Sequence, residues 1–159
     1  MYSGILVDTD TFVTKTGVRT FEAASFLKRS GADVTRVRKM FRTDLEAYKH
    51  KVEGVENAEL FMDNYAIGIL PAEGVDSPTV MAAQIANELL DVDGVKASFM
   101  LTKVKDTVYV SARSIDEVNV QVIMERLGGG GHASVAGAQF HDCTAEEARQ
   151  QLEDLLRTM

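Results

Sequence analysis

Residues 96 to 113 read KASFMLTKVKDTVYVSAR, in which two apolar runs rich in β-branched residues flank Lys105 and Asp106. Such runs favour β-strands, and two of them joined by a short polar turn are typical of an antiparallel hairpin. The sequence therefore predicts adjacent strands over residues 96–104 and 107–113. We expect the rest of the fold to assemble around this hairpin.

Further strands are predicted on both sides of the hairpin. ELFMDNYAIGIL, residues 59–70, indicates two short strands around Asp63 and Asn64, a dipeptide that suits a tight turn. AGAQF, residues 136–140, indicates one more strand near the C-terminus. The hairpin signals require antiparallel pairing in part of the resulting sheet of about five strands.

Three helices are predicted between and after these strands. Ser77 precedes Pro78, which combines a preferred N-cap residue with proline at the first helical position. Capping boxes of the type Ser/Thr-x-x-Glu begin at Ser114 and at Thr144. Residues 59–159 therefore predict an α/β fold, a mixed sheet of about five strands with flanking helices.

Residues 1–43 predict a smaller and mostly helical unit. GILV, residues 4–7, favours a strand that ends in an acidic loop at Asp8. Thr20 is expected to cap one helix and Asp33 a second. We expect apolar side chains of this unit to be exposed, or to pack on a second copy of the chain. The side chains in question are those of Phe21, Phe26, Val37 and Phe41.

Charge divides the chain close to the same place. Residues 1–52 contain ten Lys and Arg against six Asp and Glu, whereas residues 53–159 contain seven against eighteen. From Leu45 onward, apolar residues recur at helical spacing and predict a connecting helix. We therefore expect three parts, which are residues 1–43, 44–58 and 59–159.

Composition excludes several classes of protein. The 159 residues include one cysteine, Cys143, which excludes an internal disulfide and a cysteine-based zinc cluster. No run approaches the roughly 18 consecutive apolar residues of a membrane span, so we expect no membrane contact and a place in the reducing cytoplasm. The acidic larger part argues against a broad nucleic-acid-binding surface, because such surfaces depend on cations that neutralise phosphates. A small nucleotide held by a few local donors is compatible with this charge.

LGGGGHASVAG, residues 127–137, places four consecutive glycines after a predicted helix. Gly128 suffices as the C-cap of that helix, which leaves three glycines without this explanation. They form either a purely structural turn or a bare backbone against which a phosphate or a flat base lies, and the residues alone leave both interpretations open. In the second interpretation His132 supplies a hydrogen-bond donor or a stacking ring at the edge.

Taken in order, these motifs resemble the C-terminal part of a DHH–DHHA1 family phosphodiesterase, in particular the cyclic-di-AMP phosphodiesterases of the GdpP type. GGGGH resembles the nucleotide-binding signature of the DHHA1 domain, and GILVDT resembles the last metal-binding motif of the DHH domain. The resemblance covers nearly the whole chain. Its ordered segments are GILVDT at 4–9, GVRTFEAASFLKRSGAD at 17–33, KASFML at 96–101, SARS at 111–114, EVNVQVIMERL at 117–127 and GGGGH at 128–132.

The resemblance implies a two-metal hydrolase, in which a pair of manganese ions activates a water for attack on phosphorus. Asp8, at the matching position, would be a terminal Mn²⁺ ligand in the full-length enzyme. The family's first metal motif and its Asp-His-His triplet are absent from this sequence. One carboxylate cannot hold two manganese ions, so we expect an inactive fragment. It would comprise the end of a DHH domain in residues 1–43 and a complete DHHA1 domain in residues 59–159.

In such an enzyme the DHHA1 domain would hold the substrate over the metals. Arg113 would grip a phosphate through its guanidinium group, and a salt bridge to Asp116 or Glu117 is the structural alternative. Ser111 is a further candidate on the same predicted strand. The substrate-binding residues that the resemblance implies are Gly128, Gly129, Gly130, Gly131, His132, Arg113 and Ser111.

The function implied is the substrate-binding portion of a manganese-dependent phosphodiesterase that hydrolyses cyclic di-AMP to linear pApA. The alternatives are a phosphoesterase of the nanoRNase or pAp phosphatase type and a nucleotide-binding module without catalysis. The expected partners are a cyclic dinucleotide or short oligonucleotide and the remainder of the DHH domain, and a homodimer remains open. Parent proteins of the GdpP type are usually anchored in the membrane through a part that lies outside these residues, with this portion in the cytoplasm.

Overall fold

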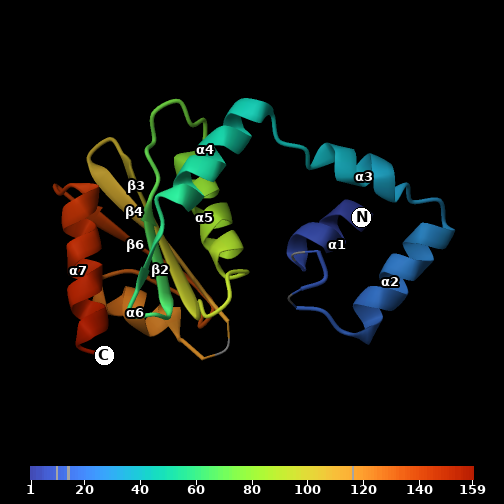
Figure 1. The fold of residues 1–159 in the computed structure, drawn as a ribbon. Coiled ribbons are helices and arrows are strands. Elements are labelled where there is room, and N and C mark those ends of the chain that lie inside the picture. Colours follow the sequence, from blue (N-terminus) through green and yellow to red (C-terminus); the bar gives the residue numbers. More distant parts are fainter. Residues whose placement is uncertain (10, 14, 116) are drawn as a thin grey trace. The chain divides into compact units, whose positions relative to one another are not determined.

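The computed structural model describes residues 1–9, 11–13, 15–115 and 117–159. The chain divides into two compact units, residues 1–44 and residues 45–159, and each unit has its own internal packing (Figure 1). Among the described residues, no helix combines the length and the hydropathy needed to cross a lipid bilayer. The larger unit contains every strand of the sheet.

The larger unit is built on a mixed sheet with the strand order β1-β2-β3-β4-β6-β5 (Figure 1). β2 and β3 are parallel, and all other neighbours are antiparallel. The expected mixed α/β class is confirmed, with a sheet of six strands. The additional strand is β5, because two of the four glycines pair with β6. The strands are β1 (Glu59–Phe61), β2 (Tyr65–Ile69), β3 (Ala97–Val104), β4 (Thr107–Ser114), β5 (Gly130–Gly131) and β6 (Val135–His141).

The hairpin predicted from residues 96–113 is confirmed as β3 and β4. The two strands pair in antiparallel register from Ala97, opposite Ser114, up to the turn. Lys105 in that turn has a φ of 56°, in the left-handed region that tight hairpin turns use. β3 lies inside the sheet, and its residues from Ala97 to Thr102 are all buried.

The turn between β1 and β2 is also confirmed, but it lies one residue earlier than predicted. Met62 and Asp63 have positive φ values of 51° and 63°, where the sequence indicated Asp63 and Asn64. Asn64 donates a hydrogen bond from its side-chain nitrogen to the carbonyl oxygen of Met62, at 3.2 Å. The asparagine therefore stabilises the turn through its side chain, as this residue type often does.

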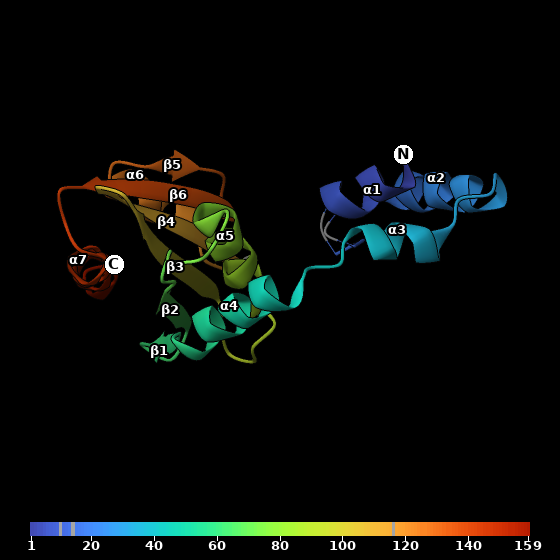
Figure 2. The same cartoon turned by 90° about the horizontal axis from the view of Figure 1, so that it is seen from above.

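Helices cover both faces of the sheet (Figure 2). On one face α5 (Pro78–Leu89) packs Ile85 into the same apolar cluster as Met100 of β3. On the other, α6 (Val120–Arg126) and α7 (Ala145–Arg157) share a cluster with Phe99 of β3. Because alternate residues of a strand point to opposite faces, β3 contributes to both layers of the core.

The helix predicted from Leu45 onward forms as α4 (Leu45–Glu56) and belongs to the larger unit. Its Gly54 is buried, and a β-carbon at that position would lie 2.5 Å from Cδ1 of Ile85 and 3.1 Å from Cδ1 of Leu70. Gly54 therefore allows α4 to lie close against α5.

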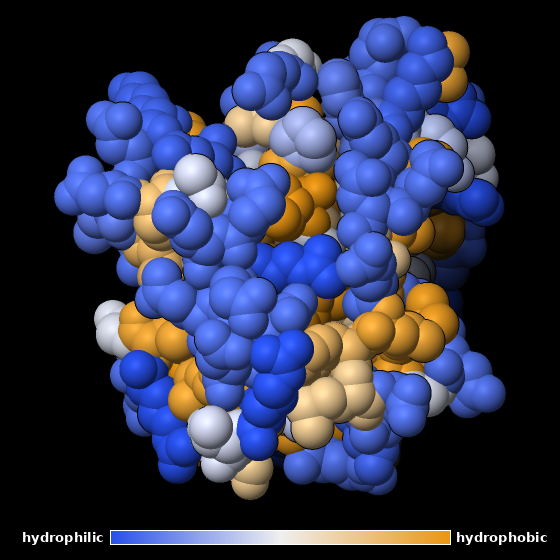
Figure 3. Space-filling view, turned by 60° about the vertical axis from the view of Figure 1, so that its left-hand side comes forward, coloured by the Kyte–Doolittle hydropathy of each residue, from blue (hydrophilic) through white to orange (hydrophobic). Residues whose placement is uncertain are grey.

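The capping box predicted at Thr144 is confirmed at the start of α7. The Thr144 hydroxyl accepts from the amide of Glu147 at 3.1 Å, and the Glu147 carboxylate accepts from the amide of Thr144 at 2.7 Å. α7 presents many charged side chains, and the face of the molecule shown in Figure 3 is mostly hydrophilic, with hydrophobic residues visible in the gaps.

The capping box predicted at Ser114 is wrong. Ser114 is the last residue of β4, and its hydroxyl donates to the carbonyl oxygen of Ala133 at 3.2 Å. The N-cap of α6 is Asn119, whose side-chain oxygen accepts from the amides of Gln121 and Val122. Pairing of β4 with β3 continues through Ser114, so that residue stays extended and the helix begins later.

The smaller unit contains three helices among its described residues, α1 (Tyr2–Asp8), α2 (Val18–Arg29) and α3 (Val34–Met40). The strand predicted over residues 4–7 is wrong, because this segment lies within α1. A strand needs a neighbour for its backbone hydrogen bonds, and the described part of this unit offers none, whereas a helix satisfies these groups internally. At the end of α1, the Thr9 hydroxyl also donates to the carbonyl oxygen of Ile5 at 2.6 Å.

The helix starts of the smaller unit are predicted in part. Asp33 caps α3 as expected and accepts from the amide of Arg36 at 3.1 Å. Thr20 does not cap α2, because the N-cap is Gly17. The Thr20 hydroxyl lies one turn inside the helix and accepts from the Gly17 amide at 3.3 Å.

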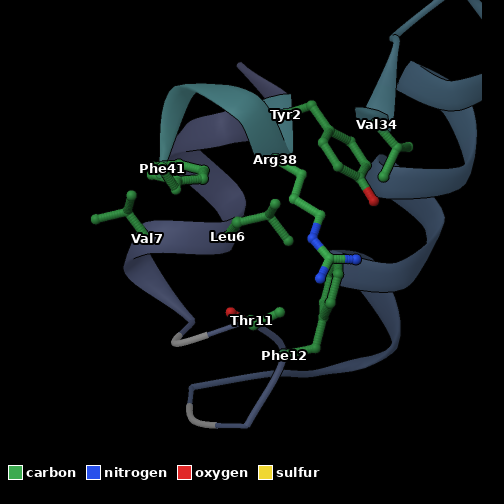
Figure 4. Close-up of a pocket in the computed structure, with 8 residues that line it drawn as sticks. All are labelled: Tyr2, Leu6, Val7, Thr11, Phe12, Val34, Arg38 and Phe41. Carbon is green, nitrogen blue, oxygen red and sulfur yellow. The ribbon is translucent and has the colours of Figure 1, made fainter. Parts of the chain in front are cut away.

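The apolar side chains of the smaller unit are largely exposed, as the sequence predicts. Phe21 is 55% exposed, Phe26 is 62% exposed and Phe41 is 49% exposed, whereas Val37 is half-buried. An open cavity of about 650 Å³ lies within the unit (Figure 4). It is lined by Tyr2, Leu6, Val7, Thr11, Phe12, Val34, Arg38 and Phe41.

Candidate functional site

The glycine run begins as the end of α6. Gly128 has a φ of 79°, a conformation that glycine adopts without a steric penalty. Its amide donates to the carbonyl oxygen of Glu125 at 3.0 Å, and the amide of Gly129 donates to that of Met124 at 2.8 Å. These bonds close the last turn of the helix, whose C-cap residue is Leu127, and Gly128 follows the cap as the left-handed glycine that ends the helix.

Gly129 and Gly131 are required by the protein's own backbone. A β-carbon on Gly129 would collide with the carbonyl oxygen of Gly137 and would lie 2.7 Å from Cα of Ala138. A β-carbon on Gly131 would lie 2.5 Å from Cα of Ala136, and the φ of Gly131 is 149°. For these two glycines the structural interpretation therefore holds, because strand β6 approaches too closely for any side chain.

Gly130 is different from both of its neighbours. A β-carbon there would meet no atom within 4 Å, and its φ lies outside the left-handed region. The residue also lines an open cavity of about 720 Å³ in the larger unit. Neither packing nor backbone conformation demands glycine at this position, so its missing side chain leaves space that is open to a ligand.

The cavity lies on the sheet beside the first turn of α5, where Thr79 contributes to its wall. Its other lining residues come from β4, the end of α6, β5 and β6, elements that lie close together in Figure 2. They are Tyr109, Val110, Ser111, Leu127, Gly128, Gly129, Gly130, Gly137, Ala138, Gln139 and His141.

Small residues form a strip across three adjacent strands of this cavity. Ser111 of β4 is paired with Gly137 of β6, and Gly137 is paired with Gly130 of β5. Val110 and Ala112 belong to the core cluster under the opposite face, so Ser111 points away from that core. We call Ser111, Gly137 and Gly130 the bare strip, because the hydroxymethyl group of Ser111 is the one side chain that the three residues carry.

Two rows of larger residues border the bare strip. Tyr109 pairs with Gln139 on one side, and Arg113 pairs with Val135 on the other. Each row is two residues along the strands from the strip, which corresponds to about 7 Å. The site therefore has a flat floor between a polar aromatic row and a cationic one.

Arg113 is half-buried, and its charge has no carboxylate partner among the described residues. Its guanidinium nitrogen Nη1 donates to the carbonyl oxygen of Ala112 at 2.8 Å. The salt bridge to Glu117 that the sequence left open does not form, because Glu117 pairs with Lys96 at 2.5 Å. Asp116, the other partner considered, lies outside the described residues. Burial lowers the pKa of Arg113, and no carboxylate in the described part of the chain forms an ion pair with it.

The structure brings together four of the predicted substrate-binding residues. Gly128, Gly129, Gly130 and Ser111 all line the cavity. Arg113 lies in the adjacent row, outside the lining. Gly131 and His132 are also outside it. His132 is exposed in the connection between β5 and β6, where its amide donates to the carbonyl oxygen of Val135 at 2.7 Å.

Sequence reasoning missed Thr79, Tyr109 and Gln139 and placed His141 only at the surface. His141 is exposed and lines the rim, with its Nδ1 3.1 Å from the hydroxyl of Thr107. The alternation of a strand could have indicated Tyr109, which lies two residues before Ser111 and therefore on the same face. Gln139 required the register of β6, which no local pattern supplies.

Asp8, the expected metal ligand, is an exposed residue at the end of α1. Across the described residues, no three His, Cys, Asp or Glu side chains gather into a group that could hold a metal ion. The donor groups of the described residues therefore do not fit a pair of manganese ions, which needs several carboxylate or imidazole ligands.

A mixed sheet with helices on both faces and an open cavity over the bare strip defines a domain of the α/β class. Residues 64–159 match the family model of the DHHA1 domain, and the chain belongs to this family.

The chain is also similar to curated proteins that are much longer. It is 44% identical to the cyclic-di-AMP phosphodiesterase PdeA of Listeria monocytogenes over 96% of this chain and 23% of that protein. It is 46% identical to the cyclic-di-AMP phosphodiesterase GdpP of Geobacillus thermodenitrificans over 98% of this chain and 24% of that protein. The resemblance to DHH–DHHA1 phosphodiesterases of the GdpP type is thus confirmed, and the chain spans about a quarter of the length of these relatives.

A solved structure shows a related fold. The exopolyphosphatase-related protein of Bacteroides fragilis superposes with a TM-score of 0.79 at 18% identity, covering 94% of this chain and 47% of that one. At this identity the likeness concerns the fold, which agrees with the mixed α/β architecture.

Proposed function

We propose that this chain is the substrate-binding portion of a manganese-dependent phosphodiesterase that hydrolyses cyclic di-AMP to linear pApA. The observation that carries the proposal is the bare strip, with Gly130 open on the side of the cavity and, in the next row, the charge of Arg113, which pairs with no described carboxylate. The names of the similar proteins PdeA and GdpP support cyclic di-AMP as the substrate.

The two features of the site suit the two parts of a nucleotide. A purine is flat, and it can lie on the bare strip because no side chain rises between Ser111 and Gly130. The phosphate lies on the side of Arg113, whose guanidinium can donate two parallel hydrogen bonds to phosphate oxygens. A half-buried guanidinium without a carboxylate partner gains more from such an anion than an exposed one, because water screens it less.

The metal-binding groups come, in this proposal, from the remainder of a DHH domain. The relatives are about four times longer than this chain, which leaves ample length for those groups. Asp8 would then be one ligand among several. The isolated chain is accordingly expected to bind the dinucleotide in the cytoplasm without hydrolysing it.

Isothermal titration calorimetry with cyclic di-AMP tests the proposal. Wild-type chain should bind it, and Gly130→Val should abolish binding, because the new side chain enters the cavity from a position where a β-carbon meets no protein atom within 4 Å. Gly4→Val is the matched control, since a β-carbon at Gly4 also meets no atom within 4 Å and Gly4 lies in the smaller unit.

Three outcomes would contradict the proposal. Equal affinities of the wild type and Gly130→Val for cyclic di-AMP would show that the dinucleotide does not bind at the bare strip. Preference for pAp over cyclic di-AMP would favour the nanoRNase or pAp phosphatase type. Hydrolysis by the purified chain with Mn²⁺ would show that it carries its own catalytic groups.

A further inference from the structure

Gln139 has an unused carboxamide at the edge of the bare strip. It is exposed, lines the cavity and lies on β6 two residues after Gly137. Its side chain forms no hydrogen bond with the described residues, whereas nearby His141 is already bonded to Thr107. Gln139 therefore offers the cavity both a free hydrogen-bond donor and a free acceptor.

We propose that Gln139 reads the edge of the nucleotide base and makes the site selective for adenine. This inference rests on the proposed function, because it requires a base on the bare strip. A base that lies flat there directs its edge along the sheet toward the row of Tyr109 and Gln139, about 7 Å from the strip. A glutamine side chain spans the remaining distance to that edge.

The chemistry of the carboxamide selects between the two purines. Adenine presents an amino donor at N6 beside an acceptor at N7, and a glutamine pairs with both at once. Guanine presents two acceptors, O6 and N7, at the same edge, so the glutamine oxygen would face an acceptor without a hydrogen between them. Ser111 lies beneath the base and cannot contact this edge.

A leucine at position 139 should remove the preference at nearly constant size, because its side chain can pair with neither purine. A glutamate only accepts hydrogen bonds, so it can accept from N6 of adenine but opposes the acceptor N7. At the same edge of guanine it opposes both O6 and N7. Gln139→Glu should therefore weaken the binding of both dinucleotides without favouring pGpG.

The test measures the affinities of pApA and pGpG by calorimetry at one fixed salt concentration. Wild type should bind pApA about tenfold or more tightly than pGpG, which is the usual discrimination provided by two hydrogen bonds from one side chain to a base. Gln139→Leu should remove most of this preference, and Gln139→Glu should weaken the binding of both dinucleotides. Gln151→Glu, an equal charge change on exposed α7, should leave the preference unchanged. Circular dichroism verifies that each variant is folded.

Two results would overturn the inference, and they are distinguishable. If pApA binds, Gly130→Val abolishes binding and Gln139→Leu retains the wild-type ratio of affinities, Gln139 does not read the base and the proposed function stands. If neither dinucleotide binds to the folded wild-type chain, the proposed function fails and this inference fails with it.

Discussion

Ser111 on β4 lies directly opposite Gly137 on β6, at the centre of the candidate site. A β-carbon on Gly137 would come within 2.8 Å of the carbonyl oxygen of Val110, so the fold itself requires glycine there. Gly130, the next residue across the sheet, has no such constraint. The bare strip thus combines one glycine that packing demands with one that packing leaves free.

Gly129 and Gly130 should differ in how much stability the same substitution removes. Gly129→Ala forces a β-carbon against β6 and should lower the free energy of unfolding by about 1–3 kcal/mol, the usual cost of overpacking. Gly130→Ala should change it by less than about 0.5 kcal/mol, because the new methyl group meets open space. Urea denaturation measures both. Equal losses of stability would show that the two positions have the same environment.

Much of the fold could be predicted where the deciding signal is local. The hairpin of β3 and β4 and the capping box at Thr144 depend on residues close in sequence, and both are confirmed. The strand predicted over residues 4–7 is wrong because apolar, β-branched composition favours a strand only where a neighbouring strand can pair with it. The capping box predicted at Ser114 is wrong because the pairing of β4 with β3 keeps this residue in the strand.

The candidate site was predictable in part for the same reason. Gly128 ends a helix, and its role followed from its position in the sequence. The need for glycine at Gly129 arises from Ala138 and its neighbour on β6, and only the paired strands reveal it. Gln139 likewise enters the cavity through the register of β6 with β4.

Arg113 should contribute to phosphate binding rather than to stability. Arg113→Gln should weaken cyclic di-AMP binding by about tenfold, since a charge-assisted bond to phosphate is lost and no ion pair within the described chain is broken. Arg29→Gln, on the exposed end of α2, serves as the charge-matched control. Calorimetry at two salt concentrations measures the effect. Unchanged affinity for Arg113→Gln would exclude the guanidinium from the site.

Asn119 should be the residue that stabilises the start of α6. Asn119→Ala should lower the free energy of unfolding by about 1 kcal/mol, because two amides of the first turn lose their acceptor. Glu117→Ala should have little effect, since its partner Lys96 is an exposed cation. Thermal denaturation compares the two variants. A larger loss of stability for Glu117→Ala than for Asn119→Ala would favour the capping box at Ser114 instead.

Glu147 should give the stability a specific dependence on pH. Hydrogen bonds from Thr144 lower the pKa of Glu147 below its ordinary value of 4.5. A carboxylate with a lowered pKa stabilises the folded state above its ordinary pKa, and this contribution is lost as the pH falls through the folded value. Glu147→Gln should therefore be less stable than wild type at neutral pH, and the difference should shrink in acid. A difference that grows as the pH falls would contradict this assignment.

The central claim is that a nucleotide binds on the bare strip. Nuclear magnetic resonance of the isotope-labelled chain, titrated with cyclic di-AMP, tests it most directly because every backbone amide reports separately. The account predicts that the largest shifts occur at Gly130, Gly137 and Ser111. Saturable shifts confined to α7 or to residues 1–44, with these three amides unmoved, would contradict it.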